Sequence, residues 1–148
     1  MVNDNIKITG DVRIDLFDET GATKDTREIK NLVVTVGKTF IASRMVGTAS
    51  TIMGYIELGT GTTAAAVGDT TLQAAIAGSR TAISSGTNAA NVVTYVASFP
   101  AGTGTGAVTE AGIFNAASAG TMLCRTVFAV VNKGAADAMS VTWTITVS

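Results

Sequence analysis

A strict two-residue alternation at the end of the chain constrains the fold most strongly. Large apolar side chains occupy positions 139, 141, 143, 145 and 147, and Ser or Thr occupies each position between them. This period is typical of a β-strand with one buried face and one face toward solvent. The segment 6–16 follows the same pattern, with one break at Gly10 where we expect a bulge.

Further short strands and two short helices are predicted between these two segments. The expected strands are 24–30, 32–36, 55–58, 92–99, 108–115 and 122–131. The expected helices are 38–46, with Phe40, Ile41 and Met45 at helical spacing, and a brief one capped by Asp69. Short strands between Gly-rich turns predict a mainly β fold, an antiparallel β-barrel or jelly-roll-like β-sandwich with one or two short helices.

Charge is concentrated at the start of the chain. Of 21 charged groups (11 acidic and 10 basic), 12 fall within residues 1–30. We therefore expect 1–148 to form a single β domain, with 1–30 as a charged N-terminal hairpin or arm. The other 118 residues carry only nine charges, so much of their surface must be buried within the domain or against partners. The net charge of −1 favours neither nucleic acid nor an anionic membrane as a partner.

The composition removes the side chains on which much catalysis depends. The chain has no His and one Cys, Cys124, so it lacks the commonest general base, a multi-Cys metal site and an internal disulfide. No apolar run approaches the roughly 18 residues of a membrane span, and the first residues do not form an apolar signal segment. We expect no enzymatic activity, no cofactor, no metal and no membrane partner.

Two glycine motifs resemble phosphate-binding loops only in part. Gly37-Lys38-Thr39 matches the end of a P-loop, but Leu32 stands where the first glycine is required, so a turn from strand to helix is predicted. Residues 59–64 fit the relaxed G-x-G-x-x-A pattern without the acidic residue expected about 20 positions later. We interpret 59–64, and the similar run 102–106, as turn-forming loops.

The acidic residues allow two interpretations each. Asp15, Asp18 and Glu19 could bind calcium weakly, but without EF-hand spacing a hairpin end in solvent is favoured. Glu57 and Glu110 lie among apolar strand residues, where an ionised carboxylate needs a partner. The favoured interpretation pairs them with arginines, and the alternative is a glycosidase-like catalytic pair. The candidate arginines are Arg44, Arg80 and Arg125.

Two further side chains have a structural and a functional interpretation. Cys124 lies within a predicted strand, where we expect a small buried hydrophobe. Trp143 lies on the alternating final strand, which favours a core position over a sugar-stacking platform.

Several stretches, taken in order, resemble small β-rich virion proteins of tailed bacteriophages. These proteins are head decoration (cement) proteins or tail-fibre-like proteins. The stretches are 31–38 (NLVVTVGK), 41–44 (IASR), 58–63 (LGTGTT), 69–72 (DTTL), 109–115 (TEAGIFN) and 141–147 (VTWTITV). The resemblance covers about residues 30–148 and contains no catalytic residue.

The resemblance implies a structural role in the virion. It implies self-association, often as a homotrimer, and docking on the major capsid protein or on a tail protein. The first hypothesis is a capsid decoration protein on the exterior of the head, made in the cytoplasm of the host bacterium. The alternative is a tail adaptor or fibre component, with Trp143 and Tyr95 as contacts if they are exposed. A glycan-cleaving enzyme using Glu57 and Glu110 is the third hypothesis.

Overall fold

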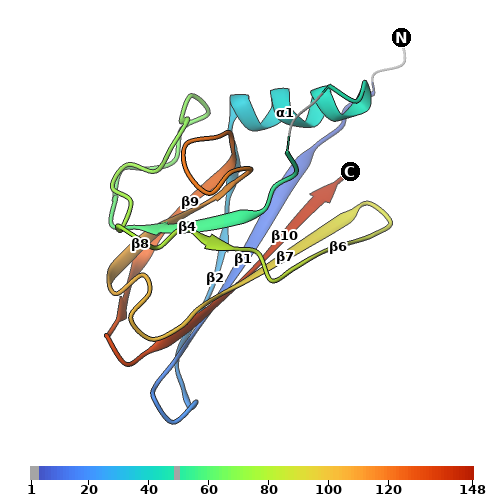
Figure 1. The fold of residues 1–148 in the computed structure, drawn as a ribbon. Helices are drawn as coiled ribbons and strands as arrows, with labels where there is room; N and C mark the ends of the chain where they lie inside the picture. Colours follow the sequence, from blue (N-terminus) through green and yellow to red (C-terminus); the bar gives the residue numbers. More distant parts are fainter. Residues whose placement is uncertain (1–3, 49–50) are drawn as a thin grey trace.

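The computed structural model describes residues 4–48 and 51–148, and it shows a mainly β protein with one α-helix (Figure 1). The predicted fold class is confirmed. In chain order the elements are β1 (Ile8–Phe17), β2 (Thr23–Lys30), β3 (Leu32–Val33), α1 (Thr35–Met45), β4 (Tyr55–Gly59), β5 (Thr81–Ala82), β6 (Ser85–Ala89), β7 (Val92–Phe99), β8 (Gly106–Phe114), β9 (Met122–Lys133) and β10 (Ala138–Val147).

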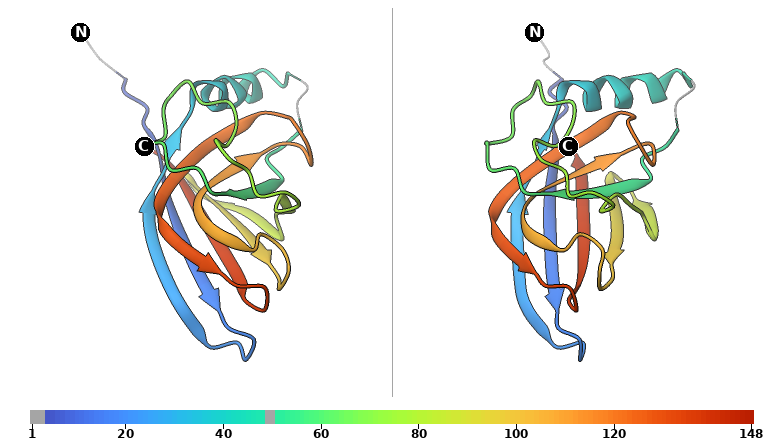
Figure 2. Two further views of the ribbon diagram at one scale, coloured as in Figure 1. Left: turned by 90° about the vertical axis from the view of Figure 1, so that its left-hand side faces the viewer. Right: turned by 60° about the vertical axis from the view of Figure 1, so that its left-hand side comes forward.

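The strands form two antiparallel five-stranded sheets that pack face to face. Sheet A has the order β2-β1-β10-β7-β6, and sheet B has the order β3-β9-β8-β4-β5. The chain passes from one sheet to the other four times, at Asn31, 83–84, 100–105 and 134–137. Over the described residues the sheets stay open, which favours the sandwich over the barrel. Figure 2 shows both sheets and the projecting β1–β2 hairpin.

The alternation read from the two terminal strands predicts the core correctly. Val12 and Ile14 of β1 lie opposite Trp143 and Val141 of β10, and all four side chains are buried. Pairing these strands at the centre of sheet A places both apolar faces against sheet B. Trp143 is therefore a core residue, as predicted.

The prediction of a bulge at Gly10 is wrong. The pairing of β1 with β10 runs without interruption past Gly10, which lies opposite Ile145. The side chain of Asn31 fills the space where a Cβ at position 10 would stand. Glycine is required there because the corner residue packs against the strand, not because the strand bends.

The helix begins earlier than predicted, and the strand before it is shorter. The segment 32–36 contributes only the two residues of β3, and α1 starts at Thr35 instead of at 38. A Cβ at Gly37 would collide with the backbone of Leu123 on β9, so the glycine lets α1 lie directly on sheet B. This close packing outweighs the preference of the β-branched residues for a strand.

The prediction of a second helix is wrong, and two strands are present that the sequence did not predict. Residues 60–80 contain no helix, and the carboxylate of Asp69 binds Arg125 instead of capping a helix. The short strands β5 and β6 carry few of the β-branched or aromatic residues that mark a strand in sequence.

Candidate functional site

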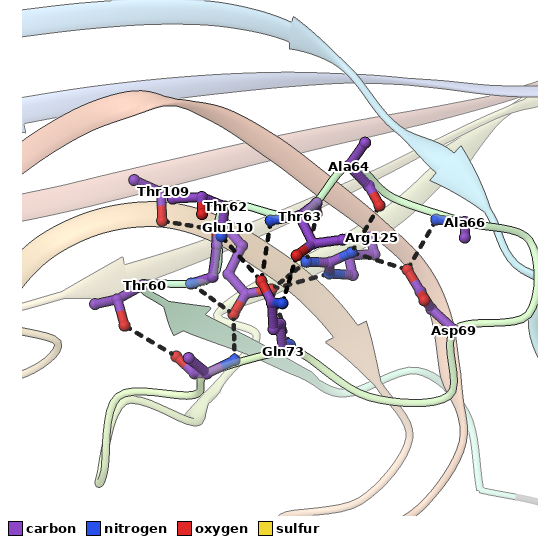
Figure 3. A network of polar contacts seen from close by, with 12 residues as sticks. Thr60, Thr62, Thr63, Ala64, Ala66, Asp69, Gln73, Thr109, Glu110 and Arg125 are labelled. Carbon is purple, nitrogen blue, oxygen red and sulfur yellow. Dashed lines mark hydrogen bonds and ion pairs between the residues drawn. The ribbon is translucent and has the colours of Figure 1, made fainter.

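The long segment 60–80 lies over the outer face of sheet B and encloses a polar network. Seven of the nine residues of β8 are buried, because the sandwich core covers one face and this segment helps to cover the other. Glu110 of β8 and Arg125 of β9 lie beneath the segment. Figure 3 shows their contacts with it.

Glu110 is fully buried and accepts hydrogen bonds on both carboxylate oxygens. Its donors are the backbone N–H groups of Gly61 (3.0 Å), Gln73 (3.0 Å) and Ala74 (2.7 Å) and the guanidinium of Arg125 (2.9 and 2.8 Å). Burial by itself would raise the pKa of Glu110, but these hydrogen bonds outweigh it and hold the pKa below its ordinary value. The group is therefore a buried carboxylate ion.

Arg125 connects Glu110 to the rest of the segment. Its guanidinium also donates to the carboxylate of Asp69 (2.8 Å) and to the carbonyl of Thr63 (3.0 Å). Hydrogen bonds from the Ala66 N–H and from Arg125 lower the pKa of Asp69. Two carboxylates and one guanidinium thus tie distant points of 60–80 to the sheet.

The glycines of the 59–64 motif lie against the carboxylate of Glu110. A Cβ at Gly59 or at Gly61 would come within 2.5 Å of a carboxylate oxygen of Glu110. The side-chain carbonyl of Gln73 accepts the N–H groups of Thr62 and Thr63, which closes the turn (Figure 3). The prediction of a turn-forming loop is confirmed, and the glycines allow close approach of the backbone to a carboxylate.

Glu57 forms a second ion pair at the edge of the same face. Its carboxylate lies 2.7 Å from the guanidinium of Arg80, which also donates to the carbonyls of Ala116 and Ala119. The guanidinium carbon of Arg80 lies 3.7 Å from the centre of the Phe114 ring. The ion-pair interpretation of Glu57 and Glu110 is confirmed, with Arg80 and Arg125 as the partners.

The other acidic candidates belong to the β1–β2 hairpin. Asp15 pairs with Arg13, and the carboxylate of Asp18 accepts the N–H groups of Thr20 and Ala22 in the turn. Across 4–48 and 51–148, no group of three or more His, Cys, Asp or Glu side chains is arranged to hold a metal ion.

The remaining candidates are buried or lie in regular structure. Cys124 is fully buried, and burial raises the pKa of its thiol. Lys38 and Thr39 lie in the first turns of α1, and Tyr95 is half-buried on β7. Within the described part of the chain, no helix is long and apolar enough to cross a membrane.

Sequence reasoning missed an exposed apolar surface around α1. Met45 and Val46 at the end of the helix are 85% and 80% exposed, and Ile52 further along the chain is 65% exposed. Val67 is 53% exposed, and its carbonyl accepts the N–H of Thr35 at the start of α1. Met45 and Val46 are neighbours at the same end of the helix, and we call these two residues the α1 surface. The helix lies across one end of the sandwich, away from the β1–β2 hairpin (Figure 2).

The network ties the segment 60–80 to sheet B through its central carboxylate. The Glu110 carboxylate is enclosed by backbone N–H donors and by the guanidinium of Arg125. Comparisons with models of protein families, with curated proteins and with solved structures find no match to this chain.

Proposed function

We propose that this chain is a capsid decoration (cement) protein of a tailed bacteriophage, which docks on the assembled head shell and stabilises it. One observation carries the proposal. The segments that resemble virion proteins, 58–63, 69–72 and 109–115, are far apart in sequence but meet in the network around Glu110. Their polar groups brace a loop against a sheet, a mechanical role that suits a protein acting through a stable shape.

The α1 surface is the proposed docking face toward the major capsid protein. Its side chains are apolar and more than half exposed, so covering them is favourable at about 25 cal/mol for each Å² removed from water. A protein that binds the assembled shell, and not its separated subunits, stabilises the assembled state by mass action. No reaction is needed for this mechanism.

Copy number in purified particles tests the proposal directly. Quantitative mass spectrometry should find this chain at an abundance comparable to that of the major capsid protein. A count that matches one small ring would refute decoration and support the tail adaptor or fibre alternative. Absence from particles would refute a virion role. Removing the chain from filled heads should also lower their rupture temperature, and an unchanged temperature would contradict the stabilising role.

Substitution of the α1 surface tests the docking face. We expect the double variant Met45→Ser and Val46→Ser to bind stripped heads at least about tenfold more weakly, the effect of about 1.4 kcal/mol. Val130→Thr is the matched control, because Val130 is an exposed apolar residue on β9 outside this surface. Both variants should unfold at the wild-type temperature. Equal binding by the double variant and the control would refute this docking face.

A further inference from the structure

The outer edge of sheet A at β6 is open and unprotected. β6 pairs with β7 on one side only, and all five of its residues, Ser85 to Ala89, are exposed. Their sequence, SGTNA, contains no charge and no proline. An edge strand presents a row of N–H and C=O groups without partners, and natural proteins usually protect such edges with charges, proline or short length.

The other edges of the two sheets carry such protection. β2, at the opposite edge of sheet A, has five charged side chains among its eight residues. The edge strands of sheet B, β3 and β5, are two residues long. Of the edges that the structure describes, β6 is thus the one that combines length with neutrality.

We propose that β6 pairs with β6 of a second copy of this chain, antiparallel, so that two copies of sheet A become one continuous sheet. The resemblance to virion proteins implies a threefold association, whereas this edge favours a twofold one. The inference goes beyond the proposed function and does not depend on it.

The register of the hairpin shows why a second copy fits. Ala89 and Val92 close the two-residue turn between β6 and β7, so Gly86 and Asn88 direct their backbone groups away from β7. A twofold axis at Thr87 places Gly86 opposite Asn88 of the second copy and Thr87 opposite its own counterpart. Each Gly–Asn pair can exchange two backbone hydrogen bonds, and no like charges meet.

The neighbouring residues favour this pairing. Gly86 lies opposite Tyr95 on β7, and a Cβ at position 86 would make an ordinary van der Waals contact with the Tyr95 ring at 3.5 Å. The missing side chain leaves room at the edge for Asn88 of the second copy. The Asn91 side chain donates a hydrogen bond to the Val147 carbonyl (2.7 Å) and holds the turn in place. Pairing of two copies therefore costs little additional conformational entropy in this hairpin.

The expected association in solution is weak. A pair of five-residue strands buries less than the roughly 1,200 Å² of a standard stable interface, so we expect dimers at micromolar to millimolar concentrations. Sedimentation velocity across that range should show a monomer–dimer equilibrium. Thr87→Lys should raise the protein concentration at the midpoint of this equilibrium about fivefold, because two ammonium groups then lie opposite each other. Thr142→Lys, on the central strand β10, is the matched control and should leave the midpoint unchanged.

Cross-linking tests the axis itself. Directly opposed residues of this kind have Cα atoms about 4.5 Å apart, within the range of a disulfide. Thr87→Cys should therefore form a disulfide-linked dimer at least about tenfold faster than Thr142→Cys under mild oxidation. Native Cys124 is buried and does not compete. A monomer at every concentration, equal cross-linking rates, or a trimer insensitive to Thr87→Lys would each overturn the proposal. Copy number in particles, which tests decoration, is independent of these results.

Discussion

Replacing Glu110 by Gln keeps the size of the side chain and removes the charge on which five hydrogen bonds converge. One carboxylate oxygen accepts the N–H groups of Gly61 and Ala74, and the other accepts Gln73 and Arg125. Whichever way the new amide is turned, its NH₂ group faces donors. The substitution therefore breaks a buried ion pair and leaves buried N–H groups without an acceptor.

The expected cost follows from this geometry. Removing one partner of a buried ion pair costs about 3–5 kcal/mol, and in a chain of this size that lowers the midpoint of thermal unfolding by about 6–20 °C. Equilibrium unfolding in urea measures the change. Asp25→Asn is the control, because the Asp25–Arg27 pair is about one-third exposed and should contribute no more than about 1 kcal/mol. Equal stability of the two variants would refute the structural role of the network.

The pH dependence of the same variant gives a second test. The folded protein lowers the pKa of Glu110 from its ordinary value of 4.5, so the stabilisation is present above that pH and is lost as the pH falls through the folded-state pKa. The difference in free energy of unfolding between wild type and Glu110→Gln should thus be largest near neutral pH and shrink in acid. A difference that grows on acidification would contradict the assigned charge.

Three further outcomes test the packing. Gly37→Ala should destabilise the fold by about 1–3 kcal/mol because α1 must move off β9, whereas Gly68→Ala, which has open space, should change stability by less than about 0.5 kcal/mol; urea unfolding compares them. Ala90→Gly should raise the free energy of unfolding by up to about 1 kcal/mol, because Ala90 has a φ of 51°; a loss of stability would contradict this. The Cys124 thiol should react with a thiol reagent only after denaturation, and rapid labelling of the folded protein would show that it is accessible.

A strand could be predicted where one of its faces is buried and the other exposed, because apolar and polar residues then alternate in the sequence. β10 has one face in the core and one in solvent, so its alternation identifies both the strand and its inner residues. β6 could not be found this way, because all five residues are exposed and no apolar face marks them. The start of α1 was misplaced because its first turn is rich in β-branched residues, while the contact that decides it is with Leu123.

The candidate site could be predicted only in its chemistry. Buried carboxylates need cationic partners, so the need for arginines near Glu57 and Glu110 follows from their apolar neighbours alone. The choice of Arg80 and Arg125 depends on the packing of 60–80 over sheet B, and so does the role of Asp69. The exposure of the α1 surface could not be predicted from the sequence, because Met45 lies at the same helical spacing as residues whose side chains are partly buried.

By itself, the order of the residues determined the fold class, the inner faces of β1 and β10 and the need to neutralise two carboxylates, because these depend on local period and on the cost of burying charge. Tertiary structure decided which arginine meets which carboxylate, why Gly10, Gly37 and Gly59 must be glycines, and which sheet edge stays open. Such features arise where segments distant in sequence come into contact, and contacts of that kind produce no periodic pattern of apolar residues in the sequence.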